Sequence, residues 1–262
     1  MPTEPKVIAV IPARWASSRF PGKPLAIILG KPMIQWVVQQ AEKCPSVSEV
    51  LVATDDQRIF DAVRGFGGQV VMTSGDHPSG TDRVAEAAAG LDCDIVVNVQ
   101  GDEPLIPPEN IDLVVQPLLK DPQAEVYTLV MKIGRTEDMF NPNVTKVVLN
   151  GQGCALYFSR APIPYDRDGW AEATPAPNTE PPRTTVLYGW KHIGLYAYTK
   201  SFLMQFNGLH GSRLETIEKL EQLRILDNGG TIRAVETDRN SIGVDREEDI
   251  PIVEEILRAL QP

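Results

Sequence analysis

The sequence contains few cysteines and few positive charges for its 262 residues. The three cysteines, Cys44, Cys93 and Cys154, are odd in number and lack metal-ligand spacing, so we expect reduced thiols. The formal net charge of -10 argues against a nucleic-acid partner or an anionic membrane surface. An apolar run long enough to span a bilayer and a signal-peptide pattern are both absent. We therefore predict a cytoplasmic protein with neither nucleic acid nor membrane as a partner.

The first half of the chain alternates strand and helix patterns. Continuous Val/Ile runs are typical of strands buried on both faces of a parallel sheet. The predicted strands are Val7–Ile11, Val50–Thr54, Gln69–Met72 and Asp94–Val99, and the predicted helices are Met33–Lys43, Gln57–Phe66 and Thr81–Gly90. Because β-α-β connections are right-handed, we expect an α/β fold with a doubly wound, mostly parallel, Rossmann-like sheet. At 28.8 kDa the chain fits a single domain over residues 1–262.

The second half follows a different pattern and predicts an antiparallel insert over residues 125–200. A helix at Pro108–Lys120 precedes strands without intervening helices, at Val126–Ile133, Lys146–Leu149, Ala155–Ser159 and His192–Tyr198. The segment Trp170–Thr185 is rich in Pro and Thr and predicts a loop.

The last part of the chain predicts two helices around a strand. A capping box at Ser212 predicts a helix to Asp227 with one apolar face, made of Leu214, Ile217, Leu220, Leu223 and Leu226. A strand at Thr231–Glu236 and a helix at Arg246–Leu260 follow.

The loop between the first strand and the first helix carries the most informative pattern. It places Ser17 and three cations, Arg14, Arg19 and Lys23, around a Pro-Gly turn in an acidic chain. A strand, a loop rich in small residues and cations, and a helix together favour phosphate binding by backbone N–H groups and positive side chains. The loop matches neither the P-loop nor the G-x-G-x-x-G pattern. The alternative is a solvated surface loop.

Two acidic positions are candidate metal ligands. Asp102 follows the strand Asp94–Val99, at the sheet edge where α/β proteins bind ligands, and Mg²⁺ takes one or two carboxylates beside substrate phosphates. A turn aspartate is the alternative. Asp245 lies three residues before Glu248, and this spacing favours a capping box. The alternative is that Asp245 is the second carboxylate ligand of the metal.

Other polar residues have structural alternatives of equal weight when each is taken alone. Ser79 or Thr81 fits a helix N-cap and Arg83 a surface cation, while Gly80 would let the backbone approach a ribose or a triphosphate. Later polar residues could together form a pocket that recognises hydroxyls and a carboxylate. They are Arg160, His192, Tyr196, Glu218, Glu221 and Gln222.

Taken in order, these segments closely resemble the 3-deoxy-manno-octulosonate cytidylyltransferases, or CMP-Kdo synthetases, over roughly residues 6–258. The matching runs share one order along the chain. They are Ile11-Pro12-Ala13-Arg14, Pro21-Gly22-Lys23-Pro24-Leu25, His77-Pro78-Ser79-Gly80-Thr81-Asp82-Arg83, Val97-Asn98-Val99-Gln100-Gly101-Asp102-Glu103-Pro104, Ala155-Leu156-Tyr157-Phe158-Ser159-Arg160, Glu218-Lys219-Leu220-Glu221-Gln222-Leu223-Arg224 and Gly243-Val244-Asp245.

The resemblance implies transfer of CMP from CTP to the anomeric hydroxyl of the acid sugar Kdo, with release of pyrophosphate, in lipopolysaccharide biosynthesis. It also implies Mg²⁺ at Asp102 and Asp245, which differs from the capping role that the local spacing favours for Asp245. It further implies a homodimer, with residues 125–200 as a candidate interface. The residues it places at the nucleotide are Arg14, Ser17, Arg19, Lys23, Ser79, Gly80, Arg83, Gln100 and Asp102. Those it places at the sugar are Gln100, Arg160, His192, Tyr196, Glu218, Glu221 and Gln222. The catalytic set is Lys23, Arg14, Asp102 and Asp245.

Two departures and two alternatives accompany this prediction. The loop Trp170–Thr185 is longer than we expect, and Lys191 stands where we expect an arginine, which removes a bidentate contact beside His192. The acceptor could instead be another acid sugar, of the sialic acid type or 8-amino-Kdo. A nucleotide-binding regulator without catalysis is disfavoured by the presence of both carboxylates with Lys23 and Arg14.

Overall fold

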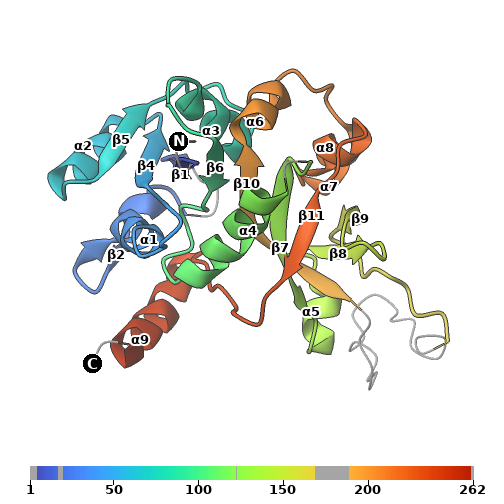
Figure 1. The fold of residues 1–262 in the computed structure, drawn as a ribbon. Helices are drawn as coiled ribbons and strands as arrows, with labels where there is room; N and C mark the ends of the chain where they lie inside the picture. The colour runs from blue at the N-terminus through green and yellow to red at the C-terminus, as the bar shows by residue number, and fades with distance from the viewer. Residues whose placement is uncertain (1–4, 17–19, 122, 169–188, 261–262) are drawn as a thin grey trace. The chain divides into compact units, whose positions relative to one another are not determined.

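The computed structural model describes residues 5–16, 20–121, 123–168 and 189–260 and divides into two compact units (Figure 1). Unit 1 consists of Met1–Val126, Gly194–Gly208 and Arg239–Pro262. Unit 2 consists of Tyr127–Ile193 and Leu209–Asp238, so it takes in much of the predicted insert and a later segment as well. None of the helices in the described part of the chain is long and apolar enough to cross a membrane.

Unit 1 is built on a mostly parallel sheet, as predicted. Its parallel strands lie in the order β6 (Ile95–Asn98), β1 (Val7–Ala13), β4 (Glu49–Thr54) and β5 (Gln69–Met72). Strand β10 (Trp190–Thr199) pairs with β6 in antiparallel register. The Val/Ile run of β1 is buried on both sides, which is why it shows no alternation in the sequence.

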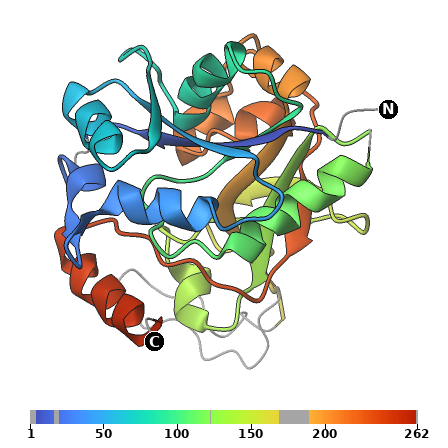
Figure 2. The same cartoon turned by 60° about the vertical axis from the view of Figure 1, so that its left-hand side comes forward.

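Helices cover both faces of the unit 1 sheet. Figure 2 shows α1 (Met33–Ala41) and α4 (Pro108–Lys120) on one face, with α3 (Gly80–Ala89) and α6 (Lys200–Phe206) on the other. The helix α2 (Gln57–Gly65) packs on β4 and β5. The four helices predicted between Met33 and Lys120 are confirmed to within two residues at each end. Helix α6 was not predicted.

The last helix packs beside the segment that follows the predicted phosphate-binding loop. A short 3₁₀ turn η1 (Lys23–Leu25) leads into the hairpin β2 (Ile27–Ile28) and β3 (Lys31–Pro32), which precedes α1. Helix α9 (Ile250–Leu260) buries Val253 and Leu257 in a cluster with Ile28 and Trp36. This apolar contact brings Asp245, which lies a few residues before α9, back to the region of Lys23.

The predicted capping role of Asp245 is wrong. The turn η2 (Glu247–Asp249) precedes α9, and the Asp249 carboxylate accepts hydrogen bonds from the backbone N–H groups of Asp245 and Arg246, both at 2.8 Å. Arg246 is the N-cap residue of this turn, and Asp249, not Asp245, supplies the capping carboxylate. The first helical residue of α9 is Ile250, four residues later than predicted.

Unit 2 contains the antiparallel strands that the sequence predicted. Strand β8 (Lys146–Leu149) pairs with β9 (Ala155–Ser159) and with the start of β10. Strands β7 (Val126–Lys132) and β11 (Arg233–Glu236) pair in parallel, and a short helix α5 (Thr136–Phe140) follows β7. The predicted loop Trp170–Thr185 lies outside the described residues.

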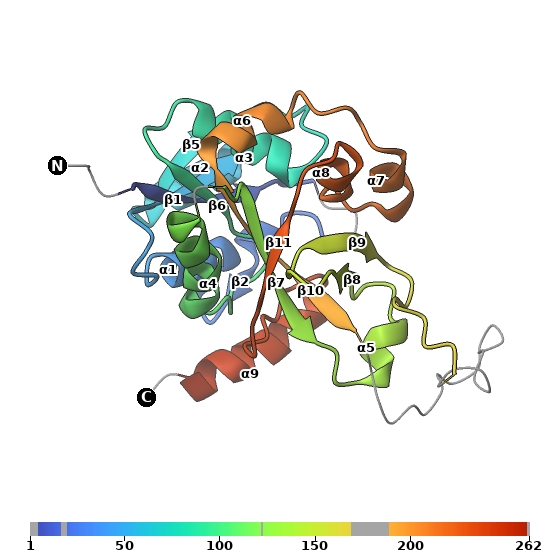
Figure 3. The same cartoon turned by 45° about the vertical axis from the view of Figure 1, so that its right-hand side comes forward.

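The single helix predicted from Ser212 to Asp227 is wrong. Two short helices, α7 (Arg213–Glu218) and α8 (Leu223–Asp227), are separated by Lys219, whose φ of 55° is in the left-handed region and ends α7 (Figure 3). The break undoes the predicted leucine face, because Leu214 is 37% and Ile217 66% exposed. Ser212 does cap α7, but Glu215 forms a salt bridge with Arg224 instead of closing a capping box.

Candidate active site

Two of the sequence motifs of unit 1 meet at Pro12, near the end of β1. A Cβ placed on Gly80, the first residue of α3, would lie 3.6 Å from the Pro12 side chain. A Cβ on Gly101, just after β6, would lie 2.7 Å from the Pro12 carbonyl oxygen, which is closer than real Cβ atoms approach. Only glycine fits at position 101, and this close approach sets where the neighbouring Asp102 lies.

The C-terminal segment reaches the same place through a backbone contact. The N–H of Val244 donates to the carbonyl of Asp102 at 2.8 Å, and a Cβ on Gly243 would lie 3.3 Å from that carbonyl oxygen. Asp245 follows directly. Two acidic residues that are 143 positions apart in the sequence are thus brought to one end of the sheet.

Lys23 lies between these two carboxylates. Its Nζ is 2.6 Å from Asp102 Oδ2, in a hydrogen-bonded ion pair, and 3.8 Å from Asp245 Oδ1. The lysine side chain is mostly buried, at 13% exposure, whereas those of Asp102 and Asp245 are 37% and 52% exposed. The carboxylates therefore face a space open to a ligand, with one cation holding them close together.

The donor set suits a hard divalent cation shared with a ligand. No group of three or more His, Cys, Asp or Glu side chains placed to hold a metal occurs in the described part of the chain. Two carboxylates that need phosphate and water oxygens to complete an octahedron are the usual protein share of a Mg²⁺ site. Burial raises the pKa of the adjacent Glu103 to about 7, and the charge of Asp102 acts in the same direction.

A backbone hydrogen bond joins the two residues that flank the middle of the opening loop, where predicted phosphate ligands lie. The N–H of Gly22 donates to the carbonyl of Trp15 at 3.0 Å, and Gly22 has a φ of 74°. The guanidinium of Arg58 lies 3.4 Å from the centre of the Trp15 ring. Arg14 is exposed. Ser17 and Arg19 lie outside the described residues, so their roles stay predictions.

The start of α3 has a structural role that the sequence left open. The Ser79 side chain accepts a hydrogen bond from the N–H of Asp82 and donates to its carboxylate, so Ser79 is the N-cap. The alternative of a surface cation is excluded for Arg83: it is 3% exposed and donates to Thr73 and to Asp55, the latter at 2.9 Å. Contact of Ser79, Gly80 and Arg83 with a nucleotide stays a prediction.

In unit 2, two residues of the predicted polar pocket, Arg160 and Glu218, form one hydrogen-bonded cluster. Glu218 accepts from the Ser159 hydroxyl at 2.6 Å and from the Arg160 N–H at 2.9 Å. The Arg160 guanidinium donates to the backbone carbonyls of Pro142, Glu218 and Lys219. A guanidinium has five N–H groups, so this arrangement leaves it with donors for a ligand.

His192 is a neutral imidazole held by its neighbours. Its Nε2 lies 2.9 Å from the Thr128 hydroxyl, and the ring of Phe158 packs edge-on against it, with 5.0 Å between ring centres. Burial lowers the pKa of His192 to about 3. The side chain can therefore hydrogen-bond to hydroxyls at neutral pH but brings no charge to a substrate.

The remaining predicted sugar residues lie in different surroundings. Tyr196, in the unit 1 part of β10, is 3% exposed and stacks on Tyr198. Gln100 follows β6, and its side chain lies beside Gly194. Gln222 is the buried N-cap residue of α8, directly after Glu221.

Comparison with known proteins identifies the family. The cytidylyltransferase family model matches residues 8–237. The chain is 52% identical to the 3-deoxy-manno-octulosonate cytidylyltransferase of Geobacter metallireducens, over 98% of this chain and 99% of that protein. It is 53% identical to the Syntrophotalea carbinolica protein of the same name, over 97% and 99%. The chain belongs to the 3-deoxy-manno-octulosonate cytidylyltransferase family.

A solved structure agrees with this assignment. The fold is similar to that of a CMP:2-keto-3-deoxy-manno-octonic acid synthetase complexed with CTP, with a TM-score of 0.86 and 41% identity over 97% of this chain and 99% of that one. The fold class and the enzyme family predicted from the sequence are confirmed. The individual roles of the residues remain predictions, which the geometry of Lys23 with Asp102 and Asp245 supports.

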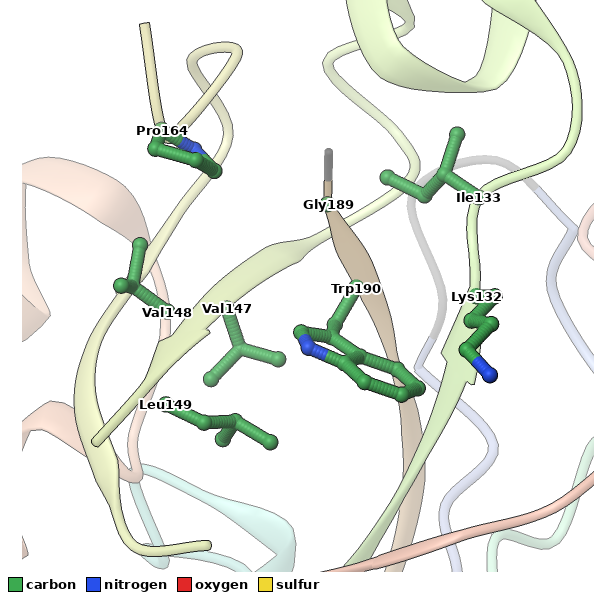
Figure 4. Close-up of a pocket in the computed structure, with 8 residues that line it drawn as sticks. All are labelled: Lys132, Ile133, Val147, Val148, Leu149, Pro164, Gly189 and Trp190. Carbon is green, nitrogen blue, oxygen red and sulfur yellow. The ribbon is translucent and has the colours of Figure 1, made fainter. Parts of the chain in front are cut away.

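A pocket of about 390 Å³ in unit 2 does not have the chemistry of a cytidylyltransferase site. Figure 4 shows the Trp190 indole between Lys132 and the side chains of Val147 and Leu149, with Pro164 at the pocket edge. Of the residues that line this pocket, Lys132 alone is titratable, and it lies 5.6 Å from the Trp190 ring centre. We assign no step of the reaction to it.

Sequence reasoning missed three groups that support the site. They are the Trp15–Arg58 stack, the Asp55 and Thr73 contacts of Arg83, and the buried Lys146. Each joins segments that are distant in the sequence or is hidden inside an ordinary strand pattern. A lysine that starts the run Lys146-Val147-Val148-Leu149 is indistinguishable from a solvated strand end.

His192 predicts a pH dependence of stability. The pKa of His192 is about 3 in the folded protein, whereas an ordinary histidine, as in the unfolded chain, has a pKa of 6.5. Between pH 3 and pH 6.5 the unfolded chain therefore binds a proton at this side chain and the folded protein does not. The free energy of unfolding should therefore fall as the pH drops below 6.5, by up to about 1.4 kcal/mol per pH unit. Urea unfolding at several pH values checks this.

Two variants isolate the contribution of His192. His192→Gln should show a shallower loss of stability between pH 6.5 and pH 4 than the unchanged protein. The matched control, His210→Gln, removes an exposed histidine and should keep the original slope. Equal slopes in all three proteins would contradict a lowered pKa at His192.

Proposed function

We propose that this protein transfers CMP from CTP to the anomeric hydroxyl of Kdo and releases pyrophosphate. One observation carries the proposal: Asp102 and Asp245, from distant parts of the sequence, lie within 4.0 Å of the same Lys23 ammonium. The family names of the relatives and the CTP-bound similar structure support the choice of reaction. Attack of a sugar hydroxyl on an α-phosphate needs positioning and charge neutralisation, and these residues supply both.

Asp102 and Asp245 would hold Mg²⁺. When bound, the metal neutralises charge on the phosphate oxygens and favours ionisation of the attacking hydroxyl. Both carboxylates are partly exposed and lie within 4.0 Å of the same Lys23 ammonium, which supports one shared ion. Lys23 now pairs with both carboxylates and offsets one of their two negative charges before a substrate binds.

Lys23 then has two successive partners in the proposed cycle. Without nucleotide its ammonium stabilises the pair of carboxylates, with the shorter contact to Asp102. With a triphosphate bound, we propose that Lys23 donates to phosphate oxygens and holds the departing pyrophosphate. Arg14, exposed after β1, would add charge to the same phosphates.

Unit 2 would recognise the acid sugar. Arg160 offers a planar cation to the sugar carboxylate, and the Glu218 carboxylate, tied to Ser159 and Arg160, fixes its position. Neutral His192 would hydrogen-bond to a hydroxyl. Substitution of Arg160 should raise the KM for the sugar and leave that for CTP nearly unchanged.

Release of pyrophosphate, measured with CTP, Mg²⁺ and a panel of acid sugars, tests the proposal. We expect turnover with Kdo and much weaker turnover with 8-amino-Kdo and a sialic acid. Turnover with one of those sugars but not with Kdo would shift the assignment to another acid sugar. CTP binding without turnover of any sugar would favour a regulator. The expected homodimer stays a separate prediction, which analytical ultracentrifugation tests.

A further inference from the structure

Lys146 is a fully buried cation that the proposed mechanism does not use. It is the first residue of β8 and is 0% exposed. Its Nζ donates to three backbone carbonyls: Asn141 at 2.8 Å, Val144 at 2.6 Å and Arg160 at 2.7 Å. Burying an ammonium is costly unless all its donors are satisfied, and here each N–H has an acceptor.

These acceptors connect Lys146 with the cluster that we assign to the acid sugar. The third carbonyl belongs to Arg160, whose N–H donates to the Glu218 carboxylate. The Arg160 guanidinium donates to the carbonyl of Pro142, in the same loop as the other two acceptors of Lys146. Lys146 and Arg160 thus hold the loop after α5 and the end of β9 against each other.

The strand register adds His192 to this arrangement. Lys146 pairs with Ser159 on β9 and with Lys191 on β10. The carbonyl of the preceding residue, Thr145, accepts a hydrogen bond from the His192 N–H at 2.8 Å. The start of β8 therefore lies between the backbones of two predicted sugar residues, His192 on one side and Arg160 on the other.

We infer that Lys146 is a positioning residue for the acid sugar: its ammonium fixes the Arg160 backbone, and through it the guanidinium and the Glu218 carboxylate. It does not touch the substrate. This inference rests on the proposed function, because it concerns recognition of the same sugar. A displacement of about 1 Å in a positioning contact costs about 100-fold in rate or binding, so loss of this ammonium should be measurable.

Lys146→Met is the direct test, with Lys200→Met as the matched control. Lys200 also donates its ammonium to a backbone carbonyl, that of Leu91, but it does so in unit 1. We expect Lys146→Met to raise the KM for Kdo about 10- to 100-fold and to change the KM for CTP less than about twofold. Lys200→Met should change neither, and Lys146→Arg, which keeps the charge, should recover part of the loss.

The outcomes separate this inference from the proposed function. If the unchanged protein turns over no acid sugar, the proposed function fails. If it does, but folded Lys146→Met raises both KM values equally or neither of them, the positioning role is contradicted. Thermal unfolding of each variant shows whether it is folded at the assay temperature.

A second measurement needs no variant at position 146. Burial and the nearby Arg160 guanidinium lower the pKa of Lys146 to about 8, while the Glu218 carboxylate acts in the opposite direction. Above that pH the Lys146 ammonium loses a proton, and the neutral amine has too few N–H groups to donate to all three carbonyls. The KM for Kdo in the unchanged protein should therefore rise above about pH 8 with a flat KM for CTP.

Discussion

Replacing Asp102 with asparagine is expected to abolish CMP transfer while the protein stays folded. The substitution keeps the side-chain volume and the backbone hydrogen bond between Asp102 and Val244, so the fold should persist. It removes a negative charge from the position where we place the divalent cation. Loss of such an electrostatic group lowers kcat by about 10³-fold or more. Pyrophosphate release and thermal unfolding measure the two effects.

Asp245→Asn should have a similar effect, because both carboxylates contact the same Lys23 ammonium. The double variant should be little worse than either single variant, since groups that act as one unit are not additive. Asp92→Asn removes an exposed carboxylate of unit 1 outside this cluster and is the matched control. Near-normal turnover in Asp102→Asn would remove the metal assignment.

Gly101→Ala is expected to have the second largest effect, through geometry rather than charge. The new Cβ would lie 2.7 Å from the carbonyl oxygen of Pro12, and a backbone atom inside the sheet cannot move aside cheaply. The loop that carries Asp102 should shift away from β1 and from Lys23. We expect kcat to fall about 100-fold, with a loss of about 1–3 kcal/mol in the free energy of unfolding.

Gly90→Ala is the control for this substitution. Gly90 ends α3 with ordinary helical dihedral angles and has open space around its Cα. Alanine there should leave both kcat and stability close to those of the unchanged protein. If Gly101→Ala behaves like Gly90→Ala, the close approach of Gly101 to Pro12 does not set the position of Asp102.

The parallel half of the fold could be predicted from the sequence because its signals are local. The buried Val/Ile run of β1 and the N-cap at Ser79 each act within a few residues. The break at Lys219 could not be predicted in this way. A left-handed lysine is stabilised by its surroundings, here the Arg160 guanidinium, which donates to the Lys219 carbonyl.

The site shows the same division between local and long-range information. Asp102 was placed correctly by its position after a buried strand. Asp245 was not, because its local spacing favours a capping box and only the packing of α9 brings it to Lys23. The family resemblance corrected this interpretation, because it carries long-range information that spacing lacks. The sequence also left the burial of Arg83 open, since its partners Asp55 and Thr73 lie outside its own helix.

A crystal structure with CTP and Mn²⁺, with the manganese located by its anomalous signal, tests the central claim most directly. We expect a metal peak at coordination distance, about 2.0–2.2 Å, from oxygens of both Asp102 and Asp245, with Lys23 moved onto the phosphates. A bound nucleotide with the metal held elsewhere, and with Lys23 still paired to Asp102, would contradict it.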